Sequence, residues 1–152
     1  MIYESDENRE DQDRCAWVLE HMGYQVTQSP REKVLPWDMA LKVENVPVAL
    51  VEFKAREVCY PTLIIDQKKI DGLIDLSSKH NVHPLLIIHW RKLGGYWAWK
   101  CHRNSLVEVF KRNKARGIPG EEPESPDLVY HVKRNEFNKR VFRRVYQTAD
   151  NR

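Results

Sequence analysis

Apolar side chains recur at helical spacing near the start of the chain. Ser5 or Asp6, both good N-caps, precedes them, and Gly23, a residue type that commonly follows the last helical residue, comes after them. The pattern predicts a first helix that ends at Gly23, followed by a short strand over 24–28. The side chains expected on the buried stripe of this helix are Cys15, Val18, Leu19 and Met22.

From Trp37 onward apolar positions alternate with polar ones, which is the period of a β-strand. The alternation runs to Val43, stops at Glu44-Asn45, and resumes as a more apolar stretch, Val46–Ala55. Two strands separated by such a short polar connection predict a β-hairpin with its turn at Glu44-Asn45.

The rest of the chain continues to mix helical and strand patterns. Helices are expected over 66–80, with Asp66 as the cap, and from residue 104 or 105 through 110. The strands expected in this part are 85–90, 96–101 and 128–132. The order α-β-β-β-α-β-β-α-β predicts an α/β or α+β fold in which helices flank a mixed central β-sheet.

Length and composition favour one soluble domain. The 152 residues have a mean hydropathy of −0.66, with 41% hydrophobic and 31% charged side chains. The longest apolar runs, 47–51 and 84–88, are too short to span a membrane, and the first residues lack the features of a signal peptide. Three cysteines without close pairing argue against a disulfide framework and favour a reducing cytoplasm.

Charge is unevenly distributed along the chain. The net charge is −5 over 1–38, +3 over 39–100 and +5 over 101–152, within a total of +3. The basic last third predicts a polyanionic partner, nucleic acid above all, although a solvated surface carries similar clusters. A stretch rich in Gly, Pro and Glu over 117–127 predicts a mobile loop in a basic C-terminal extension, 103–152, which follows a core of about residues 5–102.

The hairpin brings acidic and basic side chains to one face. Glu52 and Lys54 are two residues apart on the second strand, so they share a face while Phe53 points to the other. If the numbers of paired residues sum to 90, Asp38 lies opposite Glu52 with about 5 Å between the Cβ atoms, and Trp37 meets Phe53 on the apolar face. Two carboxylates that close repel each other unless a cation lies between them. Mg²⁺ suits such a site because it takes one or two carboxylates plus water and phosphate oxygens.

Lys54 adds a positive charge beside this predicted metal site. An ammonium group next to a metal-bound water orients the water, and it offsets the charge that develops on a phosphate in the transition state. Asp38, Glu52 and Lys54 therefore supply the groups that metal-dependent hydrolysis of a phosphodiester needs.

Asp38, thirteen intervening residues and then Glu52-Phe53-Lys54 at the end of an apolar strand resemble the motif of the PD-(D/E)xK nuclease superfamily. The resemblance covers about residues 5–100 and includes a helix before the motif and a helix with Gln67-Lys68-Lys69 after it. The aspartate here follows Trp37 rather than proline. The segments that are similar to small uncharacterised members from phages and prophages are Asn8-Arg9-Glu10, Trp37-Asp38, Glu52-Phe53-Lys54-Ala55-Arg56 and Tyr60-Pro61-Thr62.

The resemblance implies a restriction-endonuclease-like fold with an α-β-β-β-α-β core, in agreement with the order of elements above. It implies a Mg²⁺- or Mn²⁺-dependent endonuclease in which Asp38 and Glu52 bind the metal and Lys54 assists the attacking water.

Two more positions gain a role from the resemblance. Many members carry a metal-binding glutamate on the first helix, and the matching position here holds Gln12, whose amide can hold a metal-bound water but adds no charge. Glu7 and Asp11 lie near the same stripe and are alternatives to it. Lys69 is implied as a second catalytic lysine that reaches the phosphate; the alternative is a lysine that lies along the edge of the core with its ammonium group in water.

The sequence thus predicts a divalent-metal-dependent DNA endonuclease in the cytoplasm of a bacterial or phage-infected host cell. A non-catalytic nucleic-acid-binding or scaffolding protein on the same fold is the alternative function. It stays open because Gln12 stands where many members carry a metal-binding glutamate. RNA is the alternative substrate, and the sequence leaves open whether the protein is a monomer or a homodimer. A zinc site is disfavoured because the cysteines and histidines form no CxxC or HxxxH pair.

Overall fold

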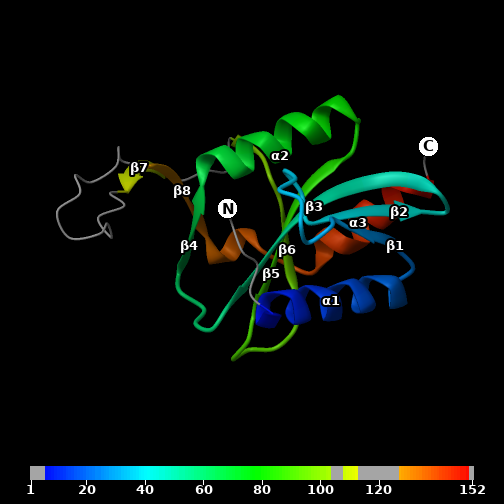
Figure 1. Ribbon diagram of the computed structural model, residues 1–152, viewed down its shortest axis with the longest axis horizontal. Coiled ribbons are helices and arrows are strands. Elements are labelled where there is room, and N and C mark those ends of the chain that lie inside the picture. Colours follow the sequence, from blue (N-terminus) through cyan, green and yellow to red (C-terminus); the bar gives the residue numbers. More distant parts are fainter. Residues whose placement is uncertain (1–5, 104–107, 113–126, 151–152) are drawn as a thin grey trace.

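The computed structural model describes residues 6–103, 108–112 and 127–150, and these form two β-sheets and three α-helices (Figure 1). The helices are α1 (Asp6–His21), α2 (Gln67–Lys79) and α3 (Arg140–Asp150), with a short 3-10 helix at Arg134–Glu136. The strands are β1 (Gln25–Gln28), β2 (Met39–Val43), β3 (Val46–Arg56), β4 (Thr62–Asp66), β5 (His83–Trp90), β6 (Trp97–Lys100), β7 (Glu108–Arg112) and β8 (Asp127–Lys133).

The central sheet has the strand order β1-β2-β3-β5-β6, with β3 and β5 parallel and the other neighbours antiparallel. The run Leu85–Ile88 of β5 is completely buried because its side chains alternate between two hydrophobic clusters, one on each face of the sheet. A strand that is covered on both faces reads as a continuous apolar run rather than an alternating one.

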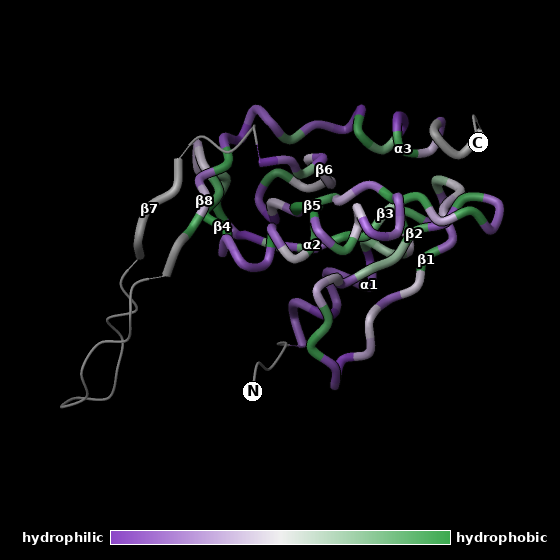
Figure 2. Tube along the Cα trace, turned by 90° about the horizontal axis from the view of Figure 1, so that it is seen from above, coloured by the Kyte–Doolittle hydropathy of each residue, from purple (hydrophilic) through white to green (hydrophobic). Residues whose placement is uncertain are grey.

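Different elements cover the two faces of the central sheet. One face packs against α1 and α3, which contribute residues such as Leu19 and Phe142 to the first cluster. The other face packs against α2 and the second sheet, which contribute residues such as Leu73 and Val132 to the second cluster. Figure 2 shows hydrophobic stretches in β3 and β5 at the centre of the molecule, with β7 and β8 to one side. The predicted fold class, a mixed sheet flanked by helices, is confirmed.

The hairpin of β2 and β3 has the turn that the sequence predicts. Glu44 and Asn45 both have positive φ, 49° and 65°, as a two-residue turn that matches the strand twist requires. The register shifts once, with Val48 as the extra residue, so that Met39 pairs with Val51 as predicted. The expected contact of Trp37 with Phe53 is wrong: β2 begins at Met39, and Trp37 packs on the second cluster, whereas Phe53 belongs to the first.

The second sheet, in the order β4-β8-β7, differs most from the sequence prediction. The predicted strand over 128–132 is confirmed in β8, but the helix predicted through Phe110 is wrong because residues 108–112 pair with β8 as strand β7. Strand β4 was not predicted at all. Backbone pairing with β8, which is remote in sequence, decides the structure of both strands.

Residues beyond 102, predicted as a basic extension, contribute to both clusters of the core. Val141, Phe142 and Val145 of α3 are buried in the first cluster, and β8 supplies Val129, Tyr130 and Val132 as buried residues. The predicted loop over 117–127 lies outside the described residues, except that Asp127 begins β8. None of the helices in the described ranges has both the length and the apolar character that a membrane span requires.

Candidate active site

Glu52 occupies the centre of a cleft because β3 turns it to the face that packs against α2. Its neighbours Val51 and Phe53 point to the opposite face and belong to the cluster under α1 and α3. The carboxylate of Glu52 is buried, which is unusual for an acid and requires charged or hydrogen-bonding partners.

The first partner of Glu52 is Asp38, the residue directly before β2. The paired register ends with Met39 and Val51, and the N–H of Asp38 donates to the carbonyl of the same Val51 at 2.7 Å, which brings Asp38 next to Glu52. Its carboxylate oxygen Oδ2 accepts a hydrogen bond from the backbone N–H of Phe53 at 2.7 Å. The side chain of Asp38 is therefore fixed at the end of the hairpin.

The two carboxyl groups lie close enough for the charge of one to act on the other. Burial, and next the charge of Glu52, raise the pKa of Asp38 to about 7, against the opposing hydrogen bond from Phe53. Near neutral pH a divalent cation can therefore take the place of the proton on Asp38. Two acids that face each other are the arrangement expected of a metal or proton site rather than of a structural ion pair.

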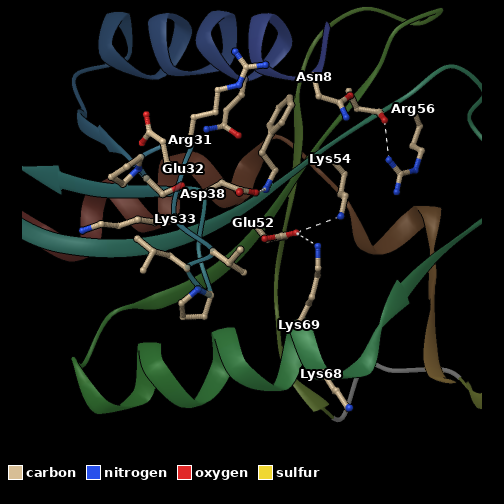
Figure 3. A pocket seen from close by; sticks show the side chains of 18 residues that line it. Asn8, Arg31, Glu32, Lys33, Asp38, Glu52, Lys54, Arg56, Lys68 and Lys69 are labelled. Atoms are coloured by element: carbon tan, nitrogen blue, oxygen red, sulfur yellow. Dashed lines mark hydrogen bonds and ion pairs between the residues drawn. The ribbon is translucent and has the colours of Figure 1, made fainter. Parts of the chain in front are cut away.

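Two lysines approach Glu52 from different elements (Figure 3). The Nζ of Lys54, two residues along β3, lies 3.3 Å from Oε1 of Glu52, and the Nζ of Lys69, from the first turn of α2, lies 3.7 Å from the same oxygen. Burial lowers the pKa of Lys54; the charge of Glu52 opposes this shift, while Lys69 and Arg56 add to it. Lys69 has a side chain 46% exposed and is directed to Glu52, so both lysines predicted for the site lie in it.

Helix α1 brings Gln12 to the same cleft. Gln12 is buried, and its Nε2 donates to Oε1 of Gln28 on β1 at 2.9 Å. Cys15 and Leu19 of the predicted stripe are buried, and so are Asp11 and Gln12, which continue the stripe toward the start of the helix. Met22, also predicted on the stripe, lies beyond the end of α1 and is exposed.

The alternative acids on α1 have partners of their own. Asp11 accepts hydrogen bonds from Arg91 at 2.7 and 2.9 Å, and Glu7 lies 3.7 Å from the same guanidinium group. Neither lines the cleft. Of the three α1 residues considered as a third metal ligand, Gln12 is therefore the one that lines the cleft.

The cleft has a volume of about 540 Å³ and lies between α1, the loop that joins β1 to β2, the end of β3 and the start of α2. Cations outnumber acids in its lining: the cations are Arg31, Lys33, Lys54, Arg56, Lys68 and Lys69, and the acids are Glu32, Asp38 and Glu52. A polyanion is the ligand that this charge distribution favours.

Arg56 is a site residue that the sequence analysis left without a role. It lies two residues beyond Lys54 on the same face of β3, and its Nη1 donates only to the adjacent carbonyl of Ala55, at 2.9 Å. Within the described part of the chain it forms no ion pair. The period-two spacing of Glu52, Lys54 and Arg56 was the signal that could have identified it.

The residues of the cleft fit a hard divalent cation that keeps much of its water shell. The described residues hold no group of three or more His, Cys, Asp or Glu side chains that could form a closed metal cage. Mg²⁺ does not need one, because it is typically held by one or two carboxylates together with waters and phosphate oxygens. Asp38 and Glu52 are the two carboxylates that this structure offers.

Comparison with known proteins confirms the fold. No family model matches the chain, and no curated protein matches its sequence. Among solved structures, that of Archaeoglobus fulgidus Hjc, a Holliday junction resolvase from an archaeal hyperthermophile, is similar with a TM-score of 0.58 and 10% sequence identity, over 94% of this chain and 98% of that chain. At this identity the likeness shows a restriction-endonuclease-like fold and nothing about activity.

Proposed function

We propose that this protein is a divalent-metal-dependent DNA endonuclease that hydrolyses phosphodiester bonds in the cleft between α1, β3 and α2. The observation that carries the proposal is the pair of carboxyl groups, buried Glu52 and half-buried Asp38, with Lys54 3.3 Å from Glu52, in a cleft where cations outnumber acids. The similarity to the resolvase structure supports DNA as the polymer, since that protein acts on a DNA junction.

Asp38 and Glu52 would hold Mg²⁺ or Mn²⁺, which supplies Lewis-acid stabilisation of the phosphate and a bound water of lowered pKa. The backbone N–H of Phe53 fixes Asp38, and the hairpin register fixes Glu52 beside it. The protein therefore presents two rigidly held acidic ligands at the end of one hairpin.

Lys54 orients the water that attacks the phosphorus, because its ammonium group is held at Glu52 and is partly desolvated. Lys69 approaches from the opposite side and reaches a non-bridging phosphate oxygen, where it offsets the negative charge of the transition state. Gln12 holds a water through its amide at the wall formed by α1.

Arg56 binds a phosphate next to the one that is cleaved. Its guanidinium group carries donors that no acid of the described residues occupies, and it lies one strand repeat beyond Lys54. Such contacts position a nucleic acid without reading its sequence.

Cleavage of a supercoiled plasmid in Mg²⁺ tests the proposal. The wild type is expected to nick or linearise the plasmid, EDTA to stop the reaction, and Asp38→Ala and Lys54→Ala to lose it. Glu10→Ala and Lys79→Ala remove the same charges at exposed positions outside the cleft and serve as matched controls that keep activity. Equal cleavage by all five proteins contradicts the assignment.

A non-catalytic nucleic-acid-binding protein is the second candidate, and Gln12 in place of a third acid is the observation that favours it. Titration calorimetry separates the two functions. A protein that binds DNA in a salt-dependent manner but binds no Mg²⁺ or Mn²⁺ is the non-catalytic one.

A further inference from the structure

The loop between β1 and β2 places apolar side chains in a cleft whose other walls are charged. Val34 is 76% exposed and Leu35 is 37% exposed, and both line the cleft together with Pro36. Exposed apolar side chains are common on protein surfaces, but these two stand beside the carboxyl pair and among cations that suit phosphates.

Several contacts hold this loop in place. The backbone N–H of Ser29 donates to the carbonyl of Asp38 at 2.8 Å and closes the base of the loop, while Arg9 donates to the carbonyl of Ser29 at 3.3 Å. Arg31 pairs with Asp6 at the start of α1, and the N–H of Lys33 donates to the carbonyl of Pro30 at 3.1 Å in a turn. The loop therefore presents Val34 and Leu35 in a fixed position.

The chemistry of a nucleic acid identifies what these side chains can contact. Phosphates pair with the cations of the cleft, and aliphatic groups have no favourable interaction with them. The largest apolar surfaces of DNA are the faces of its bases, and in a continuous duplex each face is covered by the next base pair, which leaves small groups such as thymine methyls exposed. A face becomes accessible where stacking is interrupted, and apolar side chains inserted at such steps are an established way of holding distorted DNA.

We propose that Val34 and Leu35 form an apolar wedge that packs on a base exposed at an interruption of the duplex, such as a branch point or a flap. The wedge makes the enzyme select DNA by structure rather than by sequence. This inference rests on the proposed function and adds the substrate class to it.

The proposal also predicts where the strand is cut. Leu35 is three residues before Asp38, so the wedge lies within about 10 Å of the carboxyl pair along the chain. Because a DNA strand rises about 3.4 Å per nucleotide, cleavage is expected within about three nucleotides of the interruption.

Cleavage of matched labelled DNAs tests the wedge: one continuous duplex, and one of the same sequence with a flap. The wild type is expected to cut the flap DNA at least tenfold faster. In the double variant Val34→Ser/Leu35→Ser this ratio is expected to fall at least fivefold. Leu93→Ser alters a leucine that is 61% exposed outside the cleft and is expected to keep the ratio. An unchanged ratio in the double variant, or cuts far from the flap, overturns the proposal.

A binding measurement keeps this test independent of catalysis. DNA with 2-aminopurine at the flap base is mixed with Asp38→Asn protein, with and without the two serine substitutions. Contact of the wedge with that base is expected to change the fluorescence, and the serine substitutions are expected to remove the change. If no protein cleaves any DNA but the wedge-dependent fluorescence is present, the proposed function fails and the wedge stands. If binding leaves the fluorescence unchanged, or if the serine substitutions do not alter its change, the wedge is overturned.

Discussion

Asp11 is buried and Asp38 is half-buried, and the two aspartates have very different surroundings. Asp11 on α1 is 7% exposed and accepts two hydrogen bonds from Arg91, which also reaches Glu57 at 3.1 Å. Asp38 lies beside Glu52, itself 8% exposed, and burial and then the charge of Glu52 raise the pKa of Asp38. Asp11 is paired with the guanidinium group of Arg91, whereas Asp38 faces a second acid, Glu52.

The comparison shows that burial of an acid does not by itself identify a functional site. The Asp11–Arg91 pair ties α1 to the end of β5 and is complete without any ligand, so it is explained by stability. The Asp38–Glu52 pair sets two acids side by side, with Lys54 and Lys69 at Glu52 and a backbone N–H at Asp38, and it opens on a cleft that suits a polyanion. An acid in a cleft whose pKa is raised by a neighbouring acid is the better indicator of chemistry.

The largest expected effect separates the two aspartates by one matched substitution. Asp38→Asn is expected to lower the rate of DNA cleavage at least about 10³-fold, because a metal ligand and its charge are lost, with no loss of thermal stability at pH 8. Asp11→Asn is expected to keep cleavage near the wild-type rate and to destabilise the fold by about 3 kcal/mol, because Arg91 keeps a charge that has lost its main partner. Cleavage assays and urea unfolding measure both. The opposite result, in which Asp38→Asn lowers stability and Asp11→Asn lowers the cleavage rate, would contradict this comparison.

The site at Asp38 was predictable because local rules determine it. The period of two fixes that Glu52 and Lys54 share a face, and the turn at Glu44-Asn45 fixes which residues face each other. Paired numbers that sum to 90 would centre the turn on Asn45. The observed two-residue turn at Glu44-Asn45 and the extra residue Val48 together give the same sum from the Leu41–Ala49 pair to the Met39–Val51 pair.

The contacts of Asp11 were not predictable in the same way. Its partner Arg91 is 80 residues away in sequence, and no periodicity links the two. The same holds for β4 and β7, which are strands because β8 pairs with both. The predicted helix through Phe110 followed local spacing that the pairing with β8 overrides, and α3 escaped prediction because arginines at 140, 143 and 144 surround its three buried apolar residues.

The next largest expected effect is the dependence of the free energy of unfolding on pH. Asp38 has a pKa of about 7 in the fold and about 4 in the unfolded chain, so the folded state binds more protons between these values and its stability falls as pH rises from 4 to 7. We expect a decline of about 2 kcal/mol in metal-free protein, smaller than the full pKa difference implies because Asp38 is half-buried and solvent screens its charge.

Mg²⁺ is expected to restore stability at pH 8 and to have little effect at pH 5, since it competes with the proton for the same two carboxyl groups. Urea unfolding at both pH values, with EDTA or Mg²⁺, measures this. In Asp38→Asn both the pH dependence and the effect of Mg²⁺ are expected to shrink. A wild-type profile that matches the profile of Asp38→Asn contradicts the explanation.

The smallest expected effect concerns the Mg²⁺ affinity that a third carboxylate on α1 would add to the site. Gln12→Glu places a third carboxylate in the lining of the cleft and is expected to tighten Mg²⁺ binding about tenfold, or about 1.4 kcal/mol, as calorimetry measures it. The same change removes the hydrogen bond from Gln12 to Gln28, so the metal-free protein is expected to lose about 1 kcal/mol of stability. Gln28→Glu is the control for charge: it adds the same charge next to Gln12, still accepts the hydrogen bond from Gln12 and loses its own to Asp13, but Gln28 does not line the cleft. Equal gains in Mg²⁺ affinity from the two variants would mean that α1 acts through net charge alone, and no gain from Gln12→Glu would mean that its side chain does not reach the metal.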